Sequence, residues 1–148
     1  MADDKKASVR SISTIDYVTA EKEFDRFVEL WEIDGDVETM NEESRDGYDA
    51  HKRAICRGIV RGTVTIDDEG AVTIKLPNTT ELALPEITLG VPTGAAMLKF
   101  DNYKDRQNVH KMNAMLGHMS KQNPAVFAKI DGRDLKPAMA VATLFLAS

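Results

Sequence analysis

The apolar positions near the start of the chain repeat with the period of an α-helix. Large apolar side chains recur at i, i+3, i+4 and i+7, and they are Phe24, Phe27, Val28 and Trp31. This spacing predicts an amphipathic helix over residues 20–33, with the hydroxyl of Thr19 as its N-cap. We expect Trp31 and the rest of this aromatic face to be buried, so that the helix docks on the remainder of the protein.

A second helix is predicted after an acidic connector. This connector, residues 32–43, contains six acids, one Gly and no base, which is typical of a solvated loop or a frayed helix start. Apolar positions then return at Tyr48, Ile55 and Ile59 and predict a helix over residues 46–61. Gly62 is expected to end this helix, because Gly is the usual residue just past a helix C-terminus.

Beyond this helix the pattern changes to the alternation of β-strands. Residues 63–66 and 71–76 alternate between apolar and polar side chains, and the loop between them ends in Gly70. Because Gly readily adopts the positive φ of a tight turn, the pattern predicts a β-hairpin over residues 63–76. Residues 81–89 predict a third strand, which Pro85 restricts to a sheet edge or a bulge.

The last third of the chain is predicted to be helical again. Apolar positions mark one helix around Met97 and a second over residues 109–119. Asn123–Pro124 opens a short helix, because Asn caps a helix well and Pro fits the first helical position. Either Asp131 or Asp134 caps the final helix.

Strands and helices are segregated along the chain, which indicates an α+β fold. We expect an N-terminal helix pair, a small antiparallel β-sheet made of the hairpin and an edge strand, and a C-terminal helical bundle. Three regions follow from this reading. They are a disordered or extended tail over residues 1–18, the helix pair over residues 19–61, and a domain of hairpin and helices over residues 62–148.

The chain of 148 residues carries a net charge of −5, and all of it lies in the N-terminal part. Residues 1–61 contain 15 acids and 10 bases, whereas residues 62–148 contain nine of each. Because an acidic protein repels phosphate backbones, this charge disfavours a nucleic-acid partner. With a single cysteine and no leader or membrane-spanning apolar segment, the sequence predicts a soluble, cytoplasmic protein without a disulfide framework.

The sequence lacks the spaced motifs of common catalytic and metal sites. HExxH, CxxC, GxSxG and glycine-rich phosphate loops do not occur. The stretch from Asp34 begins like a calcium loop, but Thr39 replaces its Gly and Arg45 replaces its bidentate Glu. His110 and His118 are about 12 Å apart along one predicted helix and cannot share a metal ion. We therefore expect no catalytic residue, no metal and no cofactor.

Three arginines form a row on the second predicted helix. Arg53, Arg57 and Arg61 follow one another at i, i+4 and i+8, roughly opposite the apolar face. Such a row is suited to phosphates or to an acidic partner, but the acidic connector offers simpler counter-charges, and we favour that pairing. Cys56 lies among these arginines and is interpreted as a small buried hydrophobe rather than a reactive thiol.

Methionine is concentrated in the predicted C-terminal helices, which hold five of the seven. Unbranched, polarizable Met side chains suit a surface that adapts to several apolar shapes. We predict that these helices form a groove for a helical client, with Met112, Met115, Met119, Leu135 and Met139 at or near the contact surface. Core packing at helical spacing is the alternative explanation of the same residues.

An ordered set of short blocks spans residues 73–146, about half of the chain. The blocks are Ile74–Pro77, Glu86–Gly94 with its Pro-Thr-Gly corner, Asp101, Lys111–Leu116, Ile130–Leu135 and Val141–Leu146. No single block is specific, but their order resembles the tail assembly chaperones of long-tailed bacteriophages and prophages. The helix over residues 46–61 and the hairpin also resemble the lead-in of longer, Mu-like members.

The resemblance implies a non-enzymatic chaperone. Proteins of this family bind the tape-measure protein, a long helical chain with apolar stripes, keep it soluble and help tail-tube protein polymerise around it. The resemblance also implies absence from the mature virion and, in many members, a longer form made by ribosomal frameshifting. Two alternatives stay open: a structural or tail-completion protein of the virion, and a nucleic-acid-binding adaptor that uses Arg53, Arg57 and Arg61.

Overall fold

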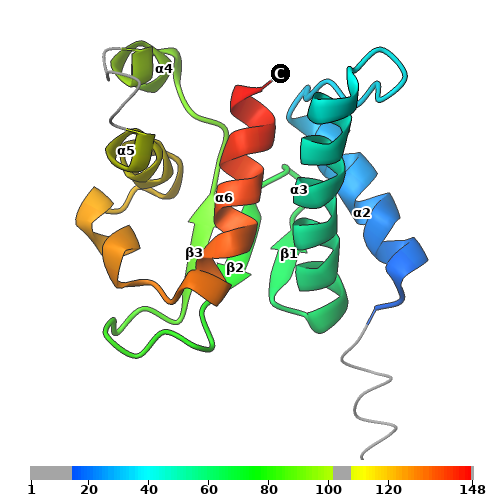
Figure 1. Ribbon diagram of the computed structural model, residues 1–148. Helices are drawn as coiled ribbons and strands as arrows, with labels where there is room; N and C mark the ends of the chain where they lie inside the picture. The colour runs from blue at the N-terminus through cyan, green and yellow to red at the C-terminus, as the bar shows by residue number, and fades with distance from the viewer. Residues whose placement is uncertain (1–14, 102–107, 148) are drawn as a thin grey trace, which may run out of the picture.

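The computed structural model describes residues 15–101 and 108–147 (Figure 1). Within them, two helices precede a three-stranded antiparallel sheet and further helices follow it, which confirms the α+β class. Residues 1–14, most of the predicted tail, lie outside the described range. Residues 17 and 18 belong to the first described helix, so the predicted tail boundary at residue 18 was too late.

Helix α2 (Tyr17–Leu30) begins earlier than predicted because a different residue caps it. The carboxylate of Asp16 accepts the backbone N–H of Thr19 at 2.7 Å, so Asp16 is the N-cap and the prediction of Thr19 was wrong. The helix ends at Leu30 rather than near residue 33, because Trp31 is the C-cap and Glu32 has a left-handed φ of 53°.

Helix α3 (Glu42–Arg61) begins four residues before the predicted start at residue 46. The side chain of Asn41 accepts the backbone N–H of Ser44 at 2.8 Å and caps the helix. The last two acids of the acidic connector therefore form the first helical turn, where negative charge is favourable. Gly62 ends the helix with a φ of 79°, as predicted.

The sheet contains the predicted hairpin and a short third strand. Strand β1 (Val64–Ile66) pairs antiparallel with β2 (Val72–Lys75), and Gly70 in the loop has a φ of 92°. Strand β3 (Glu86–Leu89) pairs with β2 at the sheet edge. It is shorter than the predicted 81–89, because Pro85 lacks the N–H that a ladder requires.

Three α-helices and one 3₁₀ helix follow the sheet within the described residues. They are α4 (Gly94–Asp101), α5 (Asn108–Ser120), η2 (Pro124–Lys129) and α6 (Gly132–Leu146). Asn123 caps η2, as predicted, with Pro124 in its first turn. Asp131 caps α6 by accepting the N–H of Arg133 at 2.9 Å, which decides between the two predicted caps.

The helices cover one face of the sheet (Figure 1). Helices α3 and α6 run antiparallel in front of it, α3 against β1 and α6 against β2, while α5 contacts β3. The inward face of the sheet is buried and consists of Val64, Val72, Ile74, Ile87 and Leu89. Its other face carries polar residues, including Thr73 and Thr88, whose hydroxyls lie 3.0 Å apart.

One hydrophobic core joins the predicted helix pair to the predicted C-terminal domain. Phe24 and Phe27 of α2 are fully buried in it, and Trp31 is 3% exposed, which confirms the predicted docking of this aromatic face. Helix α6 lies between α3 and α5, so it is the central helix of the molecule and not only a member of a C-terminal bundle (Figure 1).

Candidate functional site

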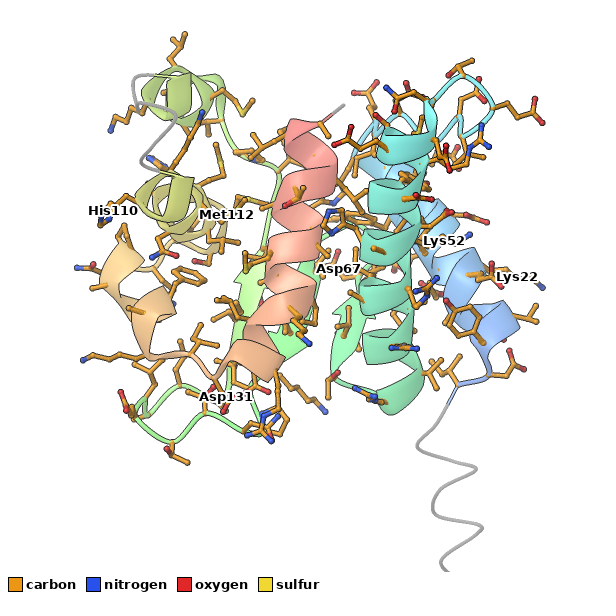
Figure 2. The ribbon with its side chains drawn as sticks, viewed as in Figure 1. Lys22, Lys52, Asp67, His110, Met112 and Asp131 are labelled. Atoms are coloured by element: carbon orange, nitrogen blue, oxygen red, sulfur yellow. The ribbon has the colours of Figure 1, made fainter. Side chains whose placement is uncertain are left out.

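The five predicted client-contact residues do not form one exposed surface. Met115 and Met119 are buried in the core, which corrects their predicted place at the contact surface. Met112 and Leu135 are partly buried against the same core, and Figure 2 shows Met112 on the side of α5 that is turned toward α6. Only Met139 of the five is exposed, at 42%. Core packing therefore accounts for the helical spacing of the α5 methionines.

The other side of α5 lines an open groove of about 470 Å³. We call it the α4/α5 groove, and its lining residues are Lys99, Ala114, Gly117, His118, Lys121, Gln122 and Pro124. Ala114 and Gly117 are small, so the lining combines shallow apolar positions with the cations Lys99 and Lys121. The groove residues were not among the predicted contact residues, because large apolar residues mark a core face more strongly than small ones mark a groove.

Gly117 is required by the close approach of the chain that follows α5. A Cβ at this position would lie 3.0 Å from the backbone oxygen of Gln122 and 3.0 Å from a ring carbon of Pro124. The absence of a side chain thus lets the turn into η2 fold against α5. Leu98 of α4 precedes the groove residue Lys99 in the sequence. It is 70% exposed, the largest exposed fraction among the large apolar residues described.

The predicted arginine row lines a second groove, between α3 and α6. Its lining residues are Ala50, Arg53, Ala54, Arg57 and Arg61 from α3 and Arg133 and Lys136 from α6, around a volume of about 360 Å³. We call this the basic groove. The antiparallel packing brings the C-terminal half of α3 beside the first turns of α6 (Figure 1). Arg133 and Lys136 were not predicted as part of this site, because no local pattern links positions so far apart in the chain.

The predicted pairing of the arginine row with the acidic connector is wrong. Between described residues, the ion pairs are Arg26–Glu23, Lys52–Glu21 and Arg133–Asp131, and none of them involves Arg53, Arg57 or Arg61. The connector lies at the opposite end of α3, where Arg45 donates to the backbone oxygen of Val37 at 3.0 Å. Distance along the helix therefore separates the acids from the arginine row.

Asp131 forms an ion pair with Arg133, one of the residues that line the basic groove. The Arg133 guanidinium donates to it at 2.9 and 3.0 Å and, with the Arg133 backbone N–H, lowers the pKa of Asp131 to about 2. Arg133 is thus partly neutralised by its own helix cap.

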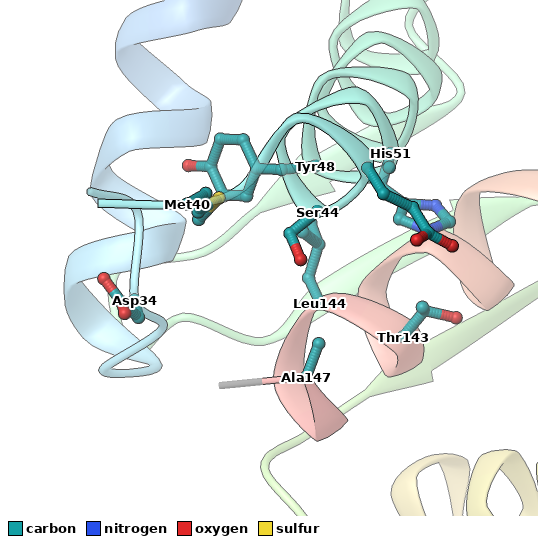
Figure 3. Close-up of a pocket in the computed structure, with 10 residues that line it drawn as sticks. Asp34, Met40, Ser44, Tyr48, His51, Thr143, Leu144 and Ala147 are labelled. Atoms are coloured by element: carbon teal, nitrogen blue, oxygen red, sulfur yellow. The ribbon is translucent and has the colours of Figure 1, made fainter. Parts of the chain in front are cut away.

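A third cavity, of about 400 Å³, lies between the N-terminal half of α3 and the C-terminal end of α6 (Figure 3). Its lining combines acids, apolar residues and an imidazole: Asp34, Met40, Glu43, Ser44, Gly47, Tyr48, His51, Thr143, Leu144 and Ala147. Burial lowers the pKa of His51, because it disfavours the charged imidazolium. In the described part of the chain, no three His, Cys, Asp or Glu side chains come together as a metal site.

Cys56 is fully buried on α3, as predicted. Burial raises the pKa of its thiol to about 11, and this outweighs the opposing effect of Lys52.

We expect Cys56 in the folded protein to resist an aromatic disulfide reagent at about pH 8. With a thiol pKa of about 11, roughly one molecule in a thousand carries the thiolate at that pH, and burial blocks access to it. The rate of labelling, followed by absorbance, should rise by orders of magnitude when urea unfolds the protein. Equal rates for the folded and unfolded protein would contradict the buried position.

Comparison with known proteins adds no family assignment. No protein-family model, curated protein or solved structure matches this chain. Among the described residues, no helix is both long enough and apolar enough to cross a membrane.

Proposed function

We propose that this protein is a phage tail assembly chaperone that binds the tape-measure protein and keeps it soluble while the tail tube polymerises. The proposal includes a non-enzymatic role in the cytoplasm of the bacterial host and absence from the mature virion. It rests on the ordered resemblance over residues 73–146. A frameshifted longer form and the tail-tube protein are further partners that the resemblance implies.

The surface around α4 supports this proposal best. Leu98 on α4 is 70% exposed, and Val91, which lies just before the helix in the block Glu86–Gly94, is also exposed. Exposed large apolar side chains next to a groove mark surfaces that bind partners. Lys99, the residue after Leu98 in α4, lines the α4/α5 groove together with Lys121. An apolar helix stripe of a client would gain burial here without disturbing the core.

Coexpression with a tape-measure fragment tests the proposal. The wild-type protein is expected to keep most of the fragment in the soluble fraction and to copurify with it. The double variant Leu98→Gln/Val91→Gln is expected to retain at least about tenfold less, because burial of each apolar side chain contributes about 1.5–3 kcal/mol. Thermal melting should show that the variant still folds, since both side chains are exposed.

A matched control changes exposed apolar residues outside residues 73–146, the span that carries the resemblance. Val18 and Leu30 of α2 are also exposed, and Val18→Gln/Leu30→Gln should retain the fragment as the wild type does. A fragment that is equally soluble without the protein would refute the chaperone role. Loss of binding by both double variants would refute the α4 surface as the contact. Stoichiometric amounts of the protein in purified virions would favour the structural tail-protein alternative.

A further inference from the structure

The basic groove concentrates positive charge from two helices that are distant in the sequence. Three arginines line it from α3, and Arg133 and Lys136 line it from α6. We propose that this groove binds an acidic helical segment of a partner protein, whose carboxylates pair with Arg53, Arg57 and Arg61. This site is separate from the α4/α5 groove, so it does not depend on the proposed chaperone function.

The arginine row forms no ion pair with a described residue. The three ion pairs described above involve other cations of the protein or, for Arg133, its own cap. Arg61 is explained by its place in the last turn of α3, where a cation complements the helix dipole. Arg57 and Arg53 lie about one and two turns earlier, where that effect fades. Their clustering costs mutual repulsion, which an anionic partner would relieve.

The spacing of the row fits a helical partner. Residues at i, i+4 and i+8 follow at a rise of about 6 Å, so a partner helix with Glu at every fourth position presents carboxylates at the same interval. Arginine binds a carboxylate through two parallel hydrogen bonds, which favours such a register. Ala50 and Ala54 lie beside the row and leave room for the approach. Lys136 adds a cation on the α6 side.

The same observations favour an acidic protein segment over a nucleic acid. The chain carries a net charge of −5, which repels a long polyanion more than a short acidic helix. The lining of the groove contains no aromatic side chain on which a base could stack. Three of its four arginines lie in one row along α3 rather than around a channel.

A designed peptide serves as the probe. It is a dye-labelled helical peptide with Glu at i, i+4 and i+8, and its partner probe carries Gln at the same positions. Fluorescence anisotropy at low ionic strength measures the binding of each peptide to the full-length protein. The Glu peptide is expected to bind, more weakly as salt is added, and the Gln peptide is expected to bind at least about tenfold more weakly.

Charge reversal in the groove provides the second comparison. Arg53→Glu/Arg57→Glu is expected to weaken binding of the Glu peptide about tenfold or more, because attraction becomes repulsion. Lys22→Glu/Lys129→Glu changes the net charge equally at exposed positions outside the groove, and it should weaken binding less than about twofold. Circular dichroism of both variants checks that the fold is intact. We expect it to be, because the substituted side chains are exposed.

Three results would overturn the proposal. The first is equal binding of the Glu and Gln peptides. The second is equal weakening by the groove variant and its control, which would reduce the effect to net charge. The third is tighter, groove-dependent binding of a single-stranded oligonucleotide than of the Glu peptide, which would assign the basic groove to nucleic acid.

Discussion

Replacing Trp31 with Ala is expected to lower the free energy of unfolding by about 3–5 kcal/mol. The indole is 3% exposed and packs on Phe27 and on Phe145, with ring centroids 5.1 and 5.8 Å away. Its Nε1–H also donates to the backbone oxygen of Gly70 at 2.7 Å. The substitution therefore leaves a cavity between α2 and α6 and an unpaired carbonyl in the hairpin loop.

Urea unfolding followed by far-ultraviolet circular dichroism measures this effect. Trp31→Phe separates the contribution of core packing from that of the hydrogen bond. It keeps an aromatic ring in the core but loses the hydrogen bond to Gly70, which is expected to lower the free energy of unfolding by about 1–2 kcal/mol. Val18→Ala on the exposed side of α2 is the control and should change stability by less than about 0.5 kcal/mol. If Trp31→Ala unfolds at the same urea concentration as the wild type, the docking of α2 described here is wrong.

Replacing Asp134 with Ala is expected to cost about 2–4 kcal/mol. Asp134 is the only charged residue that is buried in the described part of the chain, at 5% exposed. Its carboxylate accepts the backbone N–H of Asn78 at 2.9 Å, the side-chain amide of Asn78 at 2.8 Å and the hydroxyl of Thr79 at 2.7 Å. The Thr79 oxygen in turn accepts the N–H of Asp131 at 3.1 Å. Removal of the carboxylate therefore breaks the hydrogen bonds that hold the loop after β2 against the start of α6.

The matched substitutions separate charge from shape at this position. Asp134→Asn keeps the size and one carbonyl acceptor, so an intermediate loss of stability is expected, because hydrogen bonds to a charged group are stronger than neutral ones. Glu81→Ala removes an exposed acid near the same loop and should change stability by less than about 0.5 kcal/mol. Equal midpoints of thermal unfolding for Asp134→Ala and the wild type would show that the carboxylate does not hold the loop.

Elements whose causes are local were predictable from the order of the residues alone. The apolar period predicted α2 and its buried aromatic face, and the alternation around Gly70 predicted the hairpin. Gly62 and Asn123 mark a helix end and a helix start through their own backbone and side-chain preferences, so they were also predictable. Helix starts were less accurate, because Asp16 and Asn41 compete with other polar residues for the capping position.

Which surfaces come together depends on contacts between residues far apart in the chain, and these became visible only in the folded protein. The local sequence of α5 does not show whether its methionines or the small residues opposite them face the protein interior. In the folded protein Met115 is buried in the core, whereas Ala114 lines a groove. Asp134 could cap a helix by local rules, yet its partner Asn78 lies 56 residues away. The basic groove likewise exists because α3 and α6 pack antiparallel. Local propensity acts over a few residues, whereas these neighbours are set by the burial of one common core.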